Sequence, residues 1–218
     1  MIKEALVSRQ IAKLAIVPLC LFFISANAFS QDAADSLEAK KWNNSAVVLA
    51  IFTPDNSFLL PVAYINYKRW HIEPRYNYED MQTFSTFVGY NFTGGKKLKY
   101  LLTPMLGGVV GQTDGIAPGF EADLGLGRFG FYTEIEYVFD LNASEDSYFY
   151  AWSQLKFSIT KWLIVSLVGG RNRVYQNGLE VQRGVALGFK KGKNTLTGYY
   201  YNPFTPENYG SVAFFRKF

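Results

Sequence analysis

The stretch that decides the fold is RWHIEPRYNYED, which runs from Arg69 to Asp80. One set of alternating positions is apolar or aromatic, namely Trp70, Ile72, Pro74, Tyr76 and Tyr78, and the other is mostly charged, namely Arg69, His71, Glu73, Arg75, Asn77 and Glu79. A period of two indicates a β-strand with two different faces. Strands of a transmembrane β-barrel alternate in this way, because lipid accepts the apolar face and the enclosed lumen accepts the polar one. The stretch therefore predicts a barrel strand with its charges inside.

The first 28 residues have the pattern of a secretory signal peptide. Lys3, Arg9 and Lys13 make the start positive, residues 14–24 are apolar, and residues 26–28 read Ala-Asn-Ala, which are small enough for a cleavage site. A membrane anchor is the less favoured interpretation, because a spanning helix needs ~20 apolar residues. We predict cleavage after Ala28, which also removes the single cysteine, Cys20. The mature chain then has no disulfide, thiol nucleophile or cysteine metal site.

Composition indicates a membrane barrel rather than a helical membrane protein. Aromatic residues make up 17% of the chain and the mean hydropathy is near zero. After residue 28 no apolar run is long enough for a spanning helix, so the hydrophobicity is distributed in alternation. The formal net charge of +4 is small and belongs partly to the leader. A nucleic-acid partner is not expected, since it would need a concentrated basic face.

Gly, Pro, Asn and Asp divide the rest of the chain at nearly regular intervals. We expect a short periplasmic arm at residues 29–44 and one all-β domain at residues 45–218. Strands of ~9 to 12 residues suit tilted membrane strands, which predicts a transmembrane antiparallel up-and-down β-barrel of about 12 strands. Ten strands remain the alternative, because residues 45–52 are nearly continuously apolar. The expected strands are 45–53, 57–66, 69–78, 83–92, 98–110, 117–126, 129–140, 148–159, 162–174, 180–190, 195–204 and 209–218.

The turns between these strands divide by charge. Turns on the side of the two termini are nearly all basic, such as residues 93–97 and 191–193, whereas the opposite turns are mainly acidic, such as residues 79–82 and 141–146. If both termini are periplasmic, the acidic turns lie outside the cell. These outer loops are short, so they are not expected to form a large plug.

Six motifs carry a resemblance to a known family. They read EPRYNYE at 73–79, GYNF at 89–92, TPMLGG at 103–108, GIAPG at 115–119, EYVFD at 136–140 and QRG at 182–184. In this order they resemble an uncharacterised family of small Gram-negative outer-membrane β-barrel proteins, usually recorded as hypothetical proteins. The resemblance spans most of the mature chain and implies a barrel in the outer membrane, with no activity, cofactor or catalytic residue to transfer. Pro74 stands where the family has a small non-proline residue, which puts the hydrogen-bond ladder in doubt there.

The last strand resembles the signal that outer-membrane assembly machinery recognises. Val212, Phe214 and Phe218 are in phase, and Arg216 departs from the pattern, which normally has an apolar residue at that position. We expect the assembly machinery to be a partner through this strand.

Charged and polar side chains are expected to face the lumen. Extending the alternation gives Glu73, Arg75, Glu79, Glu121, Asp123, Glu134, Glu136, Gln154 and Lys156. These residues can neutralise one another in salt bridges that fill the interior, because buried charges are tolerated only when they are paired. They can also line a narrow polar pore, in which the Glu121, Glu134 and Glu136 cluster would favour cations.

Three arginines lie near the outer ends of their strands. Arg183 is in phase with the apolar Val181 and Val185, so alternation turns it toward lipid. There it would contact anionic headgroups, including those of lipopolysaccharide. Arg171 and Arg173 take the same role, unless a bulge at Gly169–Gly170 turns them inward into salt bridges.

The sequence gives little support for an enzymatic function. His71 is the only histidine, and no Ser and carboxylate partners evidently converge on it, so polar filling is the favoured role. No catalytic, cofactor-binding or metal-binding residue is assigned. We expect an outer-membrane barrel for passive passage of small solutes or ions. The competing interpretations are a structural or surface-interaction barrel with a filled, non-conducting lumen and, less favoured, a lipid-modifying enzyme.

Overall fold

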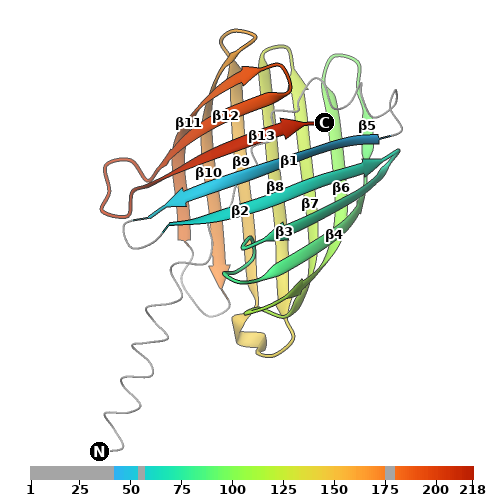
Figure 1. The fold of residues 1–218 in the computed structure, drawn as a ribbon, viewed down its shortest axis with the longest axis vertical. Helices are drawn as coiled ribbons and strands as arrows, with labels where there is room; N and C mark the ends of the chain where they lie inside the picture. The colour runs from blue at the N-terminus through green and yellow to red at the C-terminus, as the bar shows by residue number, and fades with distance from the viewer. Residues whose placement is uncertain (1–41, 54–56, 175–179) are drawn as a thin grey trace, which may run out of the picture.

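The chain forms an antiparallel β-barrel in the computed structural model, which describes residues 42–53, 57–174 and 180–218 (Figure 1). The predicted leader and residues 29–41 of the arm lie outside the described residues. The strands are β1 Trp42–Phe52, β2 Ser57–Tyr67, β3 Trp70–Tyr76, β4 Phe84–Tyr90, β5 Phe92–Gly94, β6 Lys99–Val110, β7 Gly115–Leu126, β8 Phe129–Asp140, β9 Tyr148–Ser158, β10 Leu163–Val174, β11 Glu180–Lys191, β12 Asn194–Tyr201 and β13 Tyr209–Lys217. Among these residues no helix is long and apolar enough to cross a membrane.

The barrel closes between the first strand and the last strand of the described chain. β1 pairs with β13, and β4 pairs with β6 as well as with β3, so that the sheet forms a ring in which β5 pairs with β6 alone among the described strands. β4 and β5 are two parts of the strand predicted at 83–92, separated at Asn91, and both pair with β6. The result is a closed barrel of 12 strands, which confirms the higher of the two predicted counts.

Strand bounds lie within two residues of the predicted ones, except at the start of β1 and at the end of β12, where they differ by three. β8 coincides with the predicted strand at 129–140. β1 begins at Trp42, three residues before its predicted start, because Trp42, Asn43 and Asn44 pair with the end of β2. These three residues, which the sequence placed in the arm, therefore belong to the barrel wall.

The barrel has an apolar outer surface. Exposed apolar side chains include Leu59 on β2, Ile72 on β3, Val88 on β4, Leu106 on β6 and Ile135 on β8, and the alternate positions of these strands point inward and are mostly buried. This is the alternation that residues 69–80 predicted. Lipid-facing strands require it, because a bilayer offers no hydrogen-bond partners to exposed polar groups.

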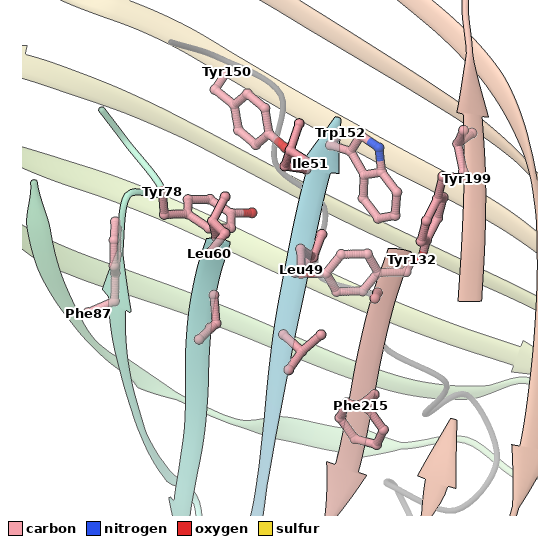
Figure 2. Close-up of a cluster of buried hydrophobic side chains, with 14 of the residues drawn as sticks. Leu49, Ile51, Leu60, Tyr78, Phe87, Tyr132, Tyr150, Trp152, Tyr199 and Phe215 are labelled. Atoms are coloured by element: carbon pink, nitrogen blue, oxygen red, sulfur yellow. The ribbon is translucent and has the colours of Figure 1, made fainter. Parts of the chain in front are cut away.

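The lumen is also packed with apolar side chains on one side. Val47, Leu49 and Ile51 of β1 and Leu60 and Val62 of β2 point inward and are at most 2% exposed. Figure 2 shows Leu49, Ile51 and Leu60 directed toward the rings of Tyr78, Tyr132, Tyr150 and Trp152 across the interior. β1 is therefore apolar on both faces, which explains why residues 45–52 show almost no alternation.

Two local departures shape β3. The pairing between β2 and β3 skips Glu73 and Pro74 and resumes at Arg75, so the ladder is interrupted where Pro74 lacks an N–H group. β3 ends at Tyr76, because Asn77 takes a positive φ of 56° and reverses the side-chain phase. Tyr78 was predicted to share the outward face, but it lies in the lumen at 2% exposure. Tyr78 and Glu79 thus both point inward.

Candidate functional site: a charged constriction in the lumen

Arg75 stands at the centre of a buried ion-pair network that crosses the lumen. Its guanidinium nitrogens lie 3.1 Å from Glu73, 3.3 Å from Glu79, 2.8 Å from Glu134 and 3.1 Å from Glu136. None of these side chains is more than 2% exposed. We call these five residues the Arg75 cluster. It ties β3 and the turn that follows it to β8.

Aromatic rings enclose the Arg75 cluster. The guanidinium carbon lies 4.2 Å from the ring centres of both Tyr78 and Phe87. The Tyr78 hydroxyl donates a hydrogen bond of 2.6 Å to Glu134. Phe87 is held over Gly107, its cross-strand partner on β6, where an added Cβ would lie 2.6 Å from the ring. These contacts fix the orientation of Arg75 by packing as well as by charge.

Glu121 lies beside the cluster on β7 and has a different partner. It stands directly opposite Glu134 of β8, and its carboxylate accepts a 2.6 Å hydrogen bond from the Tyr132 hydroxyl. The three predicted residues therefore have different partners, because Glu134 and Glu136 pair with Arg75 and Glu121 binds Tyr132. In this part of the described lumen four carboxylates pair with one guanidinium and Glu121 adds a fifth beside them, so acidic groups are in excess.

His71 joins the same network from β3. One ring nitrogen, Nε2, lies 3.0 Å from Glu73 Oε2, and Nδ1 lies 2.9 Å from Asn66 Oδ1. Ligand atoms of His71, Glu73 and Glu121 all lie within 4.8 Å of one another. The sequence assigned no metal ligands, because a single histidine with dispersed carboxylates shows no recognisable spacing. Only the barrel register brings these three together.

The other predicted lumen residues lie on β7 and β9. Asp123, Gln154 and Lys156 are at most 6% exposed and point inward. Gln154 donates a 2.9 Å hydrogen bond to Ser166. Lys156 lies 5.8 Å from the ring centre of Tyr132, and its ammonium has no hydrogen-bond partner among the described residues. All nine predicted lumen-lining residues are thus buried on the inner face, as the alternation requires.

Residues predicted at the outer rim have outward positions where their side chains are described. Arg171 and Arg183 are exposed. The register of β10 with β9 and β11 is continuous through Gly169 and Gly170, so the bulge that would have turned the arginines inward is absent there. Arg173 pairs with Phe149 through its backbone, and its side chain lies outside the described part of the structure. Contact with lipid headgroups stays a prediction.

The predicted assembly signal also keeps its phase. Val212 and Phe214 are exposed on the outer face of β13, and Phe218 follows the strand at 61% exposure. Arg216 lies outward, 5.9 Å from the Phe218 ring centre and 3.4 Å from Asn194 Oδ1. Recognition of this strand by assembly machinery stays a prediction as well.

Several residues of the site could not be identified from the alternation. Tyr78 was predicted to lie on the wrong face, because the alternation gives no indication of the positive φ at Asn77. Tyr64 and Phe87 read as ordinary strand aromatics, although both point inward beside the charged groups. The one available signal was the absence of alternation in residues 45–52, which indicates apolar packing on both faces.

Comparison with known proteins places this geometry within a known architecture. No protein-family description and no curated protein matches the chain. Among solved structures it is similar to the KdgM porin, with a TM-score of 0.60 and 9% identity over 80% of this chain and 99% of the porin. OpdK from Pseudomonas aeruginosa has a TM-score of 0.45 and 10% identity, over 78% of this chain and 60% of OpdK. OpdQ from the same organism has a TM-score of 0.44 and 10% identity, over 78% and 57%.

The chain has a porin-type barrel fold. The likeness to the KdgM porin covers nearly the whole of that protein, so the two share a complete barrel rather than a fragment. At 9% identity, the likeness concerns the fold alone.

Proposed function

We propose that this protein is a narrow, passive channel for small solutes or ions in the outer membrane of a Gram-negative bacterium, with the Arg75 cluster as its constriction. The observation that carries the proposal is the charged network across the lumen, from Arg75 on β3 to Glu134 and Glu136 on β8. Charged rings of this kind set ion selectivity in pores. The fold shared with the KdgM porin supports the same class of function.

The excess of carboxylates favours cations over anions. Glu73, Glu79, Glu134 and Glu136 share a single guanidinium, and Glu121 adds a fifth carboxylate beside them. An anion entering this region would meet carboxylate groups, and the one guanidinium there is already paired with four of them. We therefore expect passage to select for cations and neutral solutes.

We place the route past the constriction along the wall formed by β10 to β12, called the short-chain wall below. Some inner positions of these strands carry short side chains, namely Ser166, Ala186 and Thr197, which are 6% to 7% exposed, whereas Tyr199 and Tyr201 on β12 are large. By contrast, Leu49, Leu60 and Glu73 on β1 to β3 are fully buried at 0%. A solute can pass only if the side chains of this wall move out of its path, while the Arg75 cluster remains fixed.

A second candidate function is a structural barrel that does not conduct. The apolar inner wall formed by Val47, Leu49, Ile51, Leu60 and Val62 favours it, because a water-filled pore gains nothing from buried aliphatic side chains. In that case the lumen acts as a conventional core, and the salt bridges provide its polar partners.

Solute flux into proteoliposomes distinguishes the two functions. The channel predicts osmotic swelling in small neutral solutes, reduced by Ala186→Phe, which narrows the short-chain wall from inside. The matched control is Val185→Phe on the outer face of the same strand, which is 48% exposed and should leave flux unchanged.

The opposite pattern would support the filled barrel. Folded wild-type protein would then give no flux, and Trp152→Ala, which removes a ring that is 3% exposed from the interior, would create it. Flux that responds equally to Ala186→Phe and Val185→Phe would contradict the proposed route. Heat-modifiable migration in gels verifies that each variant is folded before its flux is compared.

A further inference from the structure

A buried group of one imidazole and two carboxylates lies inside the barrel at the edge of the Arg75 cluster. His71 on β3, Glu73 on β3 and Glu121 on β7 are at most 8% exposed, and their ligand atoms lie within 4.8 Å of one another. We propose that these three residues bind one divalent transition-metal ion of the Zn²⁺ class. The three side chains are called the His71 triad below.

The hydrogen bonds of His71 orient it as a metal ligand. Asn66 Nδ2 donates to the Asn43 carbonyl oxygen at 3.0 Å, and Asn91 Nδ2 donates to Asn66 Oδ1 at 2.7 Å, so Asn66 presents an oxygen to His71. His71 Nδ1 therefore donates its proton to Asn66 Oδ1. In the neutral ring Nε2 then carries the lone pair, and this is the usual arrangement behind a metal-bound histidine.

The Nε2 lone pair faces a second acceptor. Glu73 Oε2 lies only 3.0 Å away, a separation that suits two ligands on one ion at the usual zinc distances of ~2.0 to 2.2 Å. A lone pair and a carboxylate oxygen repel each other unless a cation lies between them. Either a proton or a metal ion satisfies that requirement, and the experiment below separates the two.

An unpartnered phenol provides an independent observation. Tyr64 of β2 is 4% exposed, and its hydroxyl has no hydrogen-bond partner among the described residues. Its ring centre lies 6.3 Å from that of His71, and it interacts electrostatically with Glu73 and Glu121. A buried hydroxyl in this position can bind the ion directly or bond to a water on it, which completes four-fold coordination.

Charge and ligand type select the class of ion. A divalent cation offsets part of the negative excess among Glu73, Glu121 and the remaining acids of the Arg75 cluster. The imidazole nitrogen favours Zn²⁺ and its neighbours in the first transition row over Mg²⁺ and Ca²⁺, which prefer oxygen ligands throughout. Glu121 is held in place by the Tyr132 hydroxyl at 2.6 Å, as carboxylate ligands commonly are.

Binding of Zn²⁺ to refolded, tag-free barrel in detergent tests the proposal. Calorimetry should give one saturable equivalent that excess Mg²⁺ does not displace. Because His71 is the only histidine in the chain, ¹⁵N-histidine labelling follows a single ring, and Zn²⁺ should shift its Nε2 resonance while leaving Nδ1 protonated. A bound proton alone would leave this spectrum unchanged when Zn²⁺ is added.

The Zn²⁺ affinity of substituted proteins tests which residues are ligands. Glu121→Gln and His71→Gln should each weaken binding at least tenfold, and Asn66→Ala should weaken it by about 10- to 100-fold through loss of ring orientation. The matched control is Asp123→Asn, a buried lumen carboxylate outside both the Arg75 cluster and the His71 triad, which should bind Zn²⁺ as the wild type does.

Three results would overturn the proposal: absence of one saturable equivalent, an unchanged Nε2 resonance at saturation, or equal Zn²⁺ affinity in wild type and Glu121→Gln. Should His71→Gln fail to fold, the wild-type spectrum and Glu121→Gln still decide the outcome. Equal displacement by Ca²⁺ would contradict the proposed ion class.

Discussion

Replacing Arg75 by Met removes the only guanidinium from the centre of the cluster and leaves four buried carboxylates facing one another. Met has a similar length and no charge, so the change tests charge rather than volume. The four ion pairs span 2.8 to 3.3 Å, and all members are at most 2% exposed. Removing one partner of a buried pair costs ~3 to 5 kcal/mol. The folded-to-unfolded ratio should therefore fall by about 10² to 10⁴.

Urea titration of protein refolded into phosphocholine vesicles measures this loss, with tryptophan fluorescence as the probe. Arg75→Lys keeps one positive charge but lacks the planar fork that reaches several carboxylates, so its loss should be intermediate. Glu79→Gln removes the longest of the four ion pairs and should cost least. The deficit of Arg75→Met should shrink at acidic pH, where protons replace the missing charge. A loss below ~1 kcal/mol for Arg75→Met would refute the view that Arg75 neutralises these carboxylates.

Three further outcomes follow from other parts of the barrel. Ile135→Arg places a charge on the lipid face and should cost ~2 to 4 kcal/mol of folding free energy in bilayers, whereas Ile135→Leu should fold as the wild type does. Gly107→Ala forces Phe87 away from Arg75, since the new Cβ would lie 2.6 Å from its ring, and should cost ~1 to 3 kcal/mol in the urea titration. N-terminal sequencing of the protein from the outer-membrane fraction should start at Phe29. Recovery of the uncleaved chain in the inner membrane would contradict the prediction of a cleaved signal peptide.

Much of the barrel could be predicted because its determinants are local. The alternation from Trp70 to Tyr76 and the turn residues between strands place one face in lipid and the other inside, whatever the neighbouring strands do. The inward positions of Glu134, Glu136 and Lys156 follow from the same rule. Strand ends were predictable where a tight turn separates two regular strands, as between β7 and β8 at Gly127, which has a positive φ of 60°.

The constriction itself could not be predicted, because it depends on relations between distant strands. Arg75 and Glu136 are 61 residues apart, and only the closure and tilt of the barrel bring them within 3.1 Å. The positive φ of 56° at Asn77 places Tyr78 in the lumen, although the alternation had put it on the outer face. Likewise, His71 has no ligand spacing in sequence and meets Glu121 only in the folded barrel.

Single-channel recording tests the central claim most directly. Tag-free wild-type protein is inserted into a planar bilayer under a KCl gradient, and the step conductance and reversal potential are measured. A negatively charged constriction beside a narrow route predicts small, discrete steps and a reversal potential that reports preference for K⁺ over Cl⁻. Folded barrel that inserts without conducting, or that prefers Cl⁻, would contradict the account.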